Sequence, residues 1–404
     1  MSEWKTYKLK EIAQVQTGPF GSQLHASDYV TEGIPVIMPV NIGDNKIIEK
    51  GIVRTSAEKA QELMRHFVEE GDIIYSRRGD IERKAYVTSK ERDWICGTGC
   101  LKIRVKNKNI HSKFLSYYLG TELVRNYIKT NAVGSTMPNL NTGILHNIQV
   151  LVPDLPTQTQ IAQILTSLDD KIELNLQMNQ TLEAMAQALF KEWFVNFNFP
   201  GFDGELVDGL PKGWRKCQVK DICEVNASTL NSKDAINEVH YIEISEVDRG
   251  IIKNIGIYKR GEEPSRAKRK LKHGDTVLST VRPNRGSYFL SIFPTENLIA
   301  STGFAVFSPT TVPFSYLYIF LTNDEQLEFY GKMADGAAYP AINQSVIMNM
   351  EIILPTKDLL EIYQDVSGNL LIRIFENLEA NKTLTQTRDT LLPKLMSGKI
   401  KTQA

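Results

Sequence analysis

Apolar residues recur with the spacing of a heptad between Pro156 and Asn196. The intervals alternate between four and three without a break, through Ile161, Leu165, Leu168, Ile172, Asn175, Asn179, Leu182, Ala186, Leu189 and Trp193. A seam of this length and regularity is typical of a coiled coil rather than of an ordinary core helix. At 1.5 Å per residue it predicts a helix of roughly 60 Å, which needs a partner along its length.

A second seam with the same pattern lies 202 positions further along the chain. Its series is Tyr363, Ser367, Leu370, Ile374, Asn377, Asn381, Leu384, Arg388, Leu391 and Leu395, so both Asn interruptions recur in register. A buried Asn in a coiled coil costs stability but fixes the alignment of the helices, because an amide opposite Leu has no partner. We therefore expect the two seams to pack together and the four Asn amides to meet.

The repeat continues outside the predicted helices. Gly71–Ser76 corresponds to Gly274–Ser279, and the turn Gly134–Asn141, with the pattern Gly-x-x-x-Pro-x-Leu/Ile-Asn, corresponds to Gly336–Asn343. The chain is therefore one unit written twice. This predicts a first globular head, a first helix with a connector, a second head, and a second helix with a tail, at residues 1–153, 154–212, 213–355 and 356–404.

The heads mix helical and β-rich segments. Short apolar runs such as Ile34–Val40 and Met350–Leu354 are bounded by Gly, Pro and Asn, whereas residues 112–129 and 314–332 look helical. The predicted class is α+β: two similar mixed α/β domains separated by a long antiparallel two-helix coiled coil, as a pseudo-two-fold internal repeat. The antiparallel direction follows because head two is inserted between the two helices and domain termini usually lie close together. Asn175 then faces Asn381, and Asn179 faces Asn377.

Composition adds little to this picture. The 404 residues are 42% hydrophobic and 23% charged, which excludes a disordered or fibrous chain. An apolar N-terminal segment and an apolar stretch of eighteen residues are both absent from the sequence, so we expect a cytoplasmic protein. The four Cys lack the paired spacing of a zinc site. Net charge is zero, but binding to nucleic acid depends on local patches rather than on the total.

Several motifs together resemble the specificity subunits of type I restriction-modification enzymes. They include Thr17–Ser22 (Thr-Gly-Pro-Phe-Gly-Ser), the Gly-Asp strand in each half, and Pro153–Gln160 leading into the first long helix. The order of these motifs is duplicated in the two halves together with the heptads, so the resemblance covers the whole chain. One departure is Pro355–Asp358, where the second copy reads Pro-Thr-Lys-Asp, so we expect the second helix to begin differently.

The resemblance implies a non-catalytic recognition subunit. Each head would be a target recognition domain that reads one half of a split double-stranded DNA site. The helices would set the spacing and bind two methyltransferase (M) subunits, with restriction (R) subunits completing the complex and no membrane involved. S-adenosylmethionine, ATP and Mg²⁺ would bind to those partners, and this chain would hold no cofactor.

Basic and amide side chains in loops are the candidate DNA contacts. Arg grips guanine through two hydrogen bonds and Asn reads adenine, whereas Lys more often holds phosphate. The loops after the two Gly-Asp strands, a basic flank in head two and the glycine-rich turn of head one supply the candidates: Ser22, Gln23, Arg77, Arg78, Arg83, Lys84, Lys268, Arg269, Lys270, Arg282, Asn284 and Arg285.

Two other functions are compatible with parts of the sequence. Asp72, Glu82 and Lys84 have the residue types of a metal-dependent nuclease site, but the matched positions in head two include Arg285 and Ser287, which cannot bind a metal. A purely structural coiled-coil scaffold leaves the two elaborate heads and their basic loops unexplained. DNA recognition is therefore the favoured function, and a stand-alone nuclease is the alternative.

Overall fold

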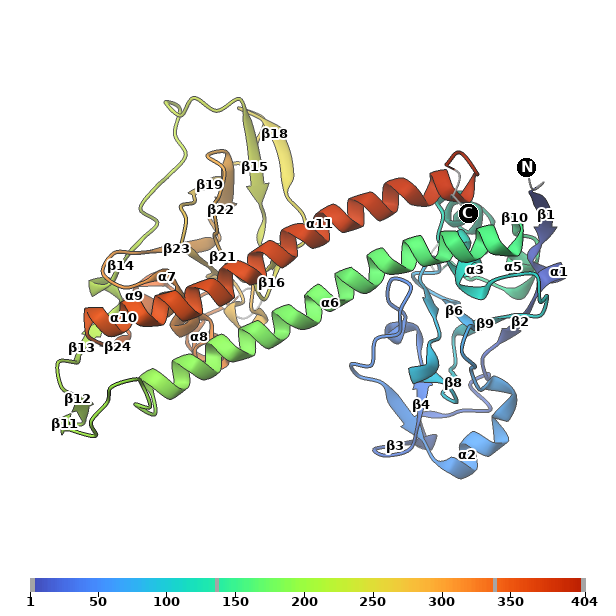
Figure 1. Cartoon of the computed structure of the whole chain (residues 1–404), viewed down its shortest axis with the longest axis horizontal. Helices are drawn as coiled ribbons and strands as arrows, with labels where there is room; N and C mark the ends of the chain where they lie inside the picture. The colour runs from blue at the N-terminus through green and yellow to red at the C-terminus, as the bar shows by residue number, and fades with distance from the viewer. Residues whose placement is uncertain (1–3, 135–137, 337–339, 401–404) are drawn as a thin grey trace. The chain divides into compact units, whose positions relative to one another are not determined.

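The computed structural model describes residues 4–134, 138–336 and 340–400. The predicted Gly-x-x-x-Pro turns lie partly outside the described residues, at positions 135–137 and 337–339. The chain divides into two compact units (Figure 1): residues 1–172 with 383–404, and residues 173–382. Each unit holds one head and part of both long helices. We keep the names head one for residues 4–153 and head two for residues 213–355.

Head one contains both strands and helices. Its strands are β1 (Lys5–Lys8), β2 (Ala13–Thr17), β3 (Tyr29–Val30), β4 (Ile34–Ile37), β5 (Val53–Thr55), β6 (Ile73–Ser76), β7 (Lys84–Tyr86), β8 (Ile95–Cys96), β9 (Cys100–Val105) and β10 (Gln149–Val152). Its helices are α1 (Leu9–Ile12), α2 (Ala57–Glu62), α3 (Ser112–Leu119), α4 (Glu122–Asn131) and α5 (Thr142–His146). Residues 112–129, predicted as one helical region, thus form two helices, α3 and most of α4.

Head one contains two four-stranded sheets and a separate two-stranded ribbon. The first sheet is antiparallel with the order β2-β9-β6-β7, and β1 pairs with β10. The second sheet has the order β3-β5-β4-β8, in which β4 and β8 are parallel. Helices α3 to α5 share a core with the first sheet, through buried residues such as Tyr75, Leu101, Phe114 and Leu145. Each large apolar side chain buried there contributes about 1.5 to 3 kcal/mol to stability.

Head two repeats this plan. Its strands are β13 (Arg215–Gln218), β14 (Cys223–Val225), β15 (Glu238–Ile242), β16 (Val247–Asp248), β17 (Ile251–Ile252), β18 (Gly256–Lys259), β19 (Ala267–Lys270), β20 (Thr276–Ser279), β21 (Tyr288–Leu290), β22 (Leu298–Ser301), β23 (Phe304–Pro309) and β24 (Glu351–Leu354). Its helices are α7 (Phe314–Thr322), α8 (Asp324–Met333) and α9 (Gln344–Met348). The connector before it holds β11 (Leu206–Val207) and β12 (Leu210–Pro211).

The sheets of head two follow the order of head one, with one difference. The antiparallel sheet β14-β23-β20-β21 matches β2-β9-β6-β7, and the pair β13 and β24 matches β1 and β10. In the other sheet, β18-β15-β22-β19, the parallel pair β15 and β22 matches β4 and β8. The edge strand β19 lies beside β22, whereas in head one the edge strand β3 lies at the opposite side of its sheet.

The first long helix, α6 (Leu155–Phe194), forms where the heptads predict it. Asp154 caps its start, since its Oδ1 accepts a hydrogen bond from the Thr157 amide at 2.8 Å. Pro156 fits in the first turn, where its missing N–H leaves no hydrogen bond unmade. The side chain of Gln158 is buried and accepts from the His111 amide (2.8 Å), which joins the helix to head one.

The second long helix starts differently. It consists of α10 (Lys357–Tyr363), a π-helical segment at Gln364–Gly368, and α11 (Asn369–Met396). Leu359 and Leu360 of its first turn are buried in the core of head two, and the hydrogen bond to head two comes later, from Gln364, whose Oε1 accepts from Ser315 Oγ at 2.8 Å. A π-helical turn inserts an extra residue into the helix, which changes the direction of the side chains around it.

The Asn residues of both helices meet within residues 173–382. Asn175 Nδ2 donates to Asn381 Oδ1 (2.8 Å), and Asn377 Nδ2 donates to Asn179 Oδ1 (2.8 Å). The pairs are those expected from the sequence, and their order shows that α6 and α11 run antiparallel there. Whether they fix the register stays a prediction. None of the helices in the described part of the chain has both the length and the hydrophobicity needed to cross a lipid bilayer.

Candidate nucleic-acid interface

A hairpin loop in each head carries most of the arginines predicted to contact DNA. In head one it joins β6 to β7, with Tyr75 opposite Lys84. In head two it joins β20 to β21, with Leu278 opposite Tyr288. Both hairpins lie at the same edge of matching sheets, so the two loops are structurally equivalent.

The two loops begin with the same hydrogen bonds. Ser76 Oγ donates to the carbonyl of Arg78, and Ser279 Oγ donates to the carbonyl of Val281, both at 2.8 Å. The loops also share a second hydrogen bond. In head one Leu140 N donates to Arg77 O, and in head two Ile342 N donates to Thr280 O, both at 2.9 Å. Arg77 is therefore equivalent to Thr280, and Arg78 to Val281.

Arg282 then occupies the position of Gly79. Both residues have positive φ, 73° for Gly79 and 48° for Arg282. Glycine adopts this left-handed conformation freely, whereas for a residue with a side chain it costs of order 1 to 3 kcal/mol in backbone strain. The loops match as predicted, but their arginines stand at different positions, so the two heads present different side chains on one backbone frame.

In head one, the glycine-rich turn lies beside this loop. The Arg77 guanidinium is 6.0 Å from the centre of the Phe20 ring, and Arg77 Nε donates to Asn139 Oδ1 at 3.3 Å. Phe20 is 55% exposed despite being aromatic. Ser22 is exposed, and the half-buried Gln23 accepts from the Phe20 amide at 3.2 Å. Ser22, Gln23, Arg77 and the exposed Arg78 thus belong to one neighbourhood. Phe20, which lies in the Thr17–Ser22 motif but was not a predicted contact, belongs to it as well.

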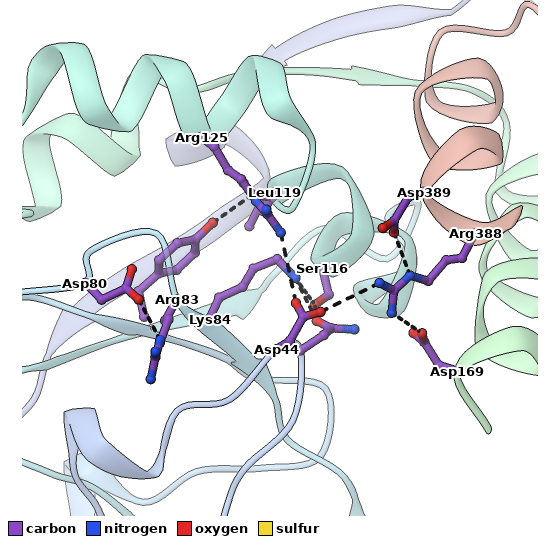
Figure 2. Close-up of polar contacts among 12 residues, drawn as sticks. Asp44, Asp80, Arg83, Lys84, Ser116, Leu119, Arg125, Asp169, Arg388 and Asp389 are labelled. Atoms are coloured by element: carbon purple, nitrogen blue, oxygen red, sulfur yellow. Dashed lines mark hydrogen bonds and ion pairs between the residues drawn. The ribbon is translucent and has the colours of Figure 1, made fainter. Parts of the chain in front are cut away.

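Arg83 and Lys84 differ although they are adjacent. Arg83 is exposed and its Nε pairs with Asp80 at 2.6 Å (Figure 2). Lys84 is only 6% exposed, and its ammonium donates to Asn45 Oδ1 (2.7 Å) and Ser116 Oγ (3.4 Å). The structure therefore argues against the DNA contact predicted for Lys84. Both faces of β7 are covered, since Ala85 is buried on one side and Lys84 lies under Ser116 of α3 on the other, and a composition-based argument cannot detect this.

Burial makes Lys84 a source of pH-dependent stability. Its pKa falls from 10.5 to about 7, chiefly because burial desolvates the ammonium; Arg125 and Lys113 also lower the pKa, while Asp44 and Asp169 raise it. Between about pH 7 and 10.5 the unfolded chain holds a proton on this amine that the folded chain lacks. In that window, the contribution of Lys84 to stability therefore rises with pH, and below it the cost is constant.

We expect Lys84→Met to raise the free energy of unfolding at pH 7 by about 1 to 4 kcal/mol, the range for replacing buried charged groups by apolar ones. Asn45 Oδ1 keeps the hydrogen bond from Ser116 Oγ (2.6 Å), so the change leaves it with a donor. Denaturant titrations of both proteins at pH 7 to 9.5 measure the difference. It should shrink as pH rises, and a constant difference would contradict the linkage to Lys84. Arg83→Met, at the exposed neighbour, is the matched control.

In head two, the basic residues fall in two places. Asn284 and Arg285 are exposed on the hairpin loop. Lys268, Arg269 and Lys270 lie on β19, the edge strand of the other sheet, and Lys270 Nζ pairs with Asp234 at 2.7 Å. The turn Thr302–Gly303 touches both regions, because Thr302 N donates to Arg266 O (2.8 Å) and Thr280 N donates to Gly303 O (3.0 Å).

Arg269 has an unusual environment. Its Nε is buried and finds no hydrogen-bond acceptor within the described residues, and burial lowers the pKa of its guanidinium. A buried guanidinium N–H without an acceptor destabilises the fold.

The nuclease alternative is not supported. Asp72 is buried and pairs with Arg104 at 2.6 Å, whereas Glu82 pairs with Lys129 at 3.0 Å. Asp72 and Lys84 lie about three residues apart along the sheet, because Lys84 is opposite Tyr75. Nowhere in residues 4–134, 138–336 and 340–400 do three His, Cys, Asp or Glu side chains gather as metal ligands would.

Two equivalent α+β heads with basic hairpin loops define an architecture suited to reading two DNA half-sites. The chain matches a family described as the type I restriction modification DNA specificity domain, over residues 1–184 and again over residues 211–389. It therefore belongs to this family, as the motifs indicated. The duplicated match agrees with the two heads seen in the structure.

Individual relatives extend over the whole chain. The type I restriction enzyme HindI specificity subunit of Haemophilus influenzae is 26% identical, over 99% of this chain and 100% of the relative. The MjaIX specificity subunit of Methanocaldococcus jannaschii is 24% identical, over 99% and 94%. The crystal structure of a type I S subunit from M. genitalium has a TM-score of 0.58 at 16% identity, over 98% and 96%, which shows a common fold.

Proposed function

We propose that this chain reads a bipartite double-stranded DNA site, with one half-site for each head. The observation that carries the proposal is the pair of hairpin loops, which share their initial hydrogen bonds but differ in side chains. Head one has Arg77, Arg78 and Gly79 where head two has Thr280, Val281 and Arg282. One frame with two sets of side chains suits two half-sites of different sequence, since base contacts determine specificity.

The helices complete this proposal. They would form one antiparallel coiled coil with a pseudo-two-fold axis near the four Asn residues, and hold the heads at a fixed separation. The proposed domains are residues 1–153 and 213–355 for recognition, with spacer segments 154–212 and 356–404. Two methyltransferase subunits and the restriction subunits would assemble on this frame in the cytoplasm. S-adenosylmethionine, ATP and Mg²⁺ would act on those partners, and this chain would be non-catalytic.

Methylation mapping tests the proposal directly. The full chain, expressed with the methyltransferase subunits of its own system, should give methylated positions that define one split sequence with a constant gap. The same subunits without this chain should give no sequence-specific methylation. Methylation at a single uninterrupted sequence, or at unrelated sequences, would contradict the two-head proposal.

Arg282 offers a sharp test within head two. Arg282→Gly removes the side chain and also the strain of a positive φ, since Gly79 holds that position in head one. We expect stability to increase by about 1 kcal/mol and binding to weaken by about 1 to 3 kcal/mol, with relaxed discrimination only in half-site two. Thermal melting and competition binding with duplexes altered at single positions measure both effects.

Lys268→Ala is the comparison for Arg282→Gly. A lysine on phosphate should weaken binding to all sequences alike and reduce the salt slope by about one. If Arg282→Gly behaves as this comparison is expected to, Arg282 contacts phosphate rather than a base. Unchanged binding would remove it from the interface.

A further inference from the structure

Arg388 is a charged residue in an apolar seam. It occupies the position in helix α11 that Ala186 occupies in α6, 202 positions earlier. Its side chain is only 20% exposed, and its Nη1 donates to Asp169 Oδ1 of α6 at 2.8 Å (Figure 2). Both residues belong to the compact unit of residues 1–172 and 383–404. Nε donates to the neighbouring Asp389 at 2.9 Å. The positive charge is therefore held inside the contact between the two helices.

Asp169 is fixed from the other side by head one. It is 26% exposed, and the hydroxyl of Tyr117, on α3, donates to its Oδ2 at 2.6 Å. Asp44, on the loop between β4 and β5, lies 3.8 Å from Arg388 and 4.0 Å from Arg125 of α4. Tyr117, Asp169 and Arg388 thus form a hydrogen-bonded row, which we call the end-one cluster, and Asp44 extends it at its exposed side.

The equivalent positions in residues 173–382 are apolar. Moving 202 positions along the repeat takes Asp169 to Leu371, and moving 202 positions back takes Arg388 to Ala186. Both Leu371 and Ala186 are buried in the core that head two shares with the helices. The two ends of the helix repeat therefore use different chemistry, although the Asn residues between them are the same.

The Asn residues alone cannot distinguish the two helices. Because each helix carries Asn at the same two heptad positions, an antiparallel pair of α6 helices from two copies would place Asn175 opposite Asn179. A pair of α11 helices would place Asn377 opposite Asn381 in the same way. Every amide would again face an amide, so the interruptions align helices without choosing which helices pair.

The end-one cluster removes this ambiguity. In a pair of α6 helices, Asp169 would lie opposite Ala186, and in a pair of α11 helices, Arg388 would lie opposite Leu371. Asp169 would then be a charge in an apolar contact without its Arg388 counter-ion, and Arg388 would keep only Asp389 of its own helix and the exposed Asp44, both of which are unfavourable arrangements. Only α6 with α11 brings Asp169 to Arg388. Charged groups that penalise the wrong partner are a known means of pairing specificity in coiled coils.

We propose that the end-one cluster of Tyr117, Asp169 and Arg388 selects α6 as the partner of α11 and excludes pairing of like helices between two copies of this chain. The excluded partner is thus a second copy of the same protein. This selection is independent of what the heads bind. It would favour a single chain folding onto itself over exchange of helices between chains.

The double change Asp169→Leu and Arg388→Ala tests the proposal in the full chain, because it gives end one the residues of end two. Both proteins are refolded from denaturant at a series of concentrations and analysed by size-exclusion chromatography with light scattering. The original chain should refold as a monomer. The double variant should form a dimer whose fraction is several-fold higher and rises with protein concentration.

A cross-link identifies which helices pair. Met178 is half-buried and flanks the seam between Asn175 and Asn179, so two antiparallel α6 helices would bring this position close to its own copy, on the same side of the contact. Met178→Cys with a short thiol-specific linker should cross-link only when added to the double variant. The four native cysteines are buried and give a low background. A double variant that remains monomeric, or dimers that do not cross-link, would overturn the proposal.

Two further variants make the result specific. Asp170→Leu with Lys394→Ala removes one exposed carboxylate and one exposed ammonium from the same helices. It should refold as a monomer, and dimers at the level of the double variant would overturn the proposal. Asp169→Asn keeps the shape of the side chain if the double variant folds poorly. Combined with Met178→Cys, it should give an intermediate yield of cross-linked dimer, and a yield equal to that of Met178→Cys alone would count against the cluster.

Discussion

Replacing residues 213–355 by the corresponding domain of a related chain is expected to change one half of the recognised DNA sequence completely and leave the other half intact. The physical reason is that each head has a hairpin loop of its own and a core of its own. The exchanged domain brings its own side chains on the same kind of frame. Methylation mapping of the hybrid with its partner subunits gives the recognised sequence.

The exchange must respect an aromatic cluster that joins head two to the helices. Phe194 at the end of α6 lies 4.8 Å from both Tyr316 of α7 and Tyr363 of α10, and 5.9 Å from Trp214, measured between ring centres. Trp214 and Tyr316 are inside the exchanged segment, whereas Phe194 and Tyr363 are outside it. A donor domain that keeps these two aromatic residues should fold, and one that lacks them should lose several degrees of melting temperature.

A reciprocal hybrid is the control. Replacing residues 1–153 should change only the other half-site, and combining both exchanges should change both halves independently. If either single exchange altered both halves, the heads would not read DNA separately. If neither exchange altered the sequence while the hybrids still bound DNA, specificity would lie outside the heads.

The sequence predicted the structure best in the long helices, where the heptad pattern repeats over many residues. The seam residues of α6 and α11 are all buried or half-buried, as heptad positions require. The contacts of Asn175 with Asn381 and Asn179 with Asn377 could be predicted because only one antiparallel alignment satisfies all four amides. The mixed α+β class could also be predicted, from apolar runs of strand length and from segments with helical periodicity.

Local contacts could not be predicted in this way. Whether Lys84 is buried depends on the packing of Asn45 and of α3 over β7, because both faces of this strand are covered. The equivalence of Arg282 with Gly79 depends on backbone hydrogen bonds that no residue pattern encodes. Asp44 and Tyr117 join Arg388 and Asp169 only through tertiary structure. A charged residue at a seam position, Arg388 where the first helix has Ala186, was the one signal in the sequence that pointed to this cluster.

Changing Asn381 alone to Leu should lower stability more than any other single change among the four seam amides. Asn175 Oδ1 is already buried without a hydrogen bond within the described residues, and its Nδ2 donates to Asn381. Loss of Asn381 leaves that amide unsatisfied at both atoms, which costs about 1 to 3 kcal/mol. Asn377→Leu should cost less, because Asn179 Nδ2 still donates to the carbonyl of Ile374 at 3.3 Å.

Changing all four residues to Leu together should instead raise stability above that of every single variant, because apolar groups of similar size replace buried amides that face one another. Thermal melting of the original chain, the four single variants and the quadruple variant measures the series. The helix register is measured separately, in variants with one introduced cysteine on the exposed face of α6 and one on that of α11, from which pairs form cross-links. We expect several cross-linked alignments in the quadruple variant and one in the original chain, because Leu accepts neighbouring heptads where paired amides do not. A quadruple variant less stable than Asn381→Leu would mean that the amides stabilise the helices in their own right rather than aligning them.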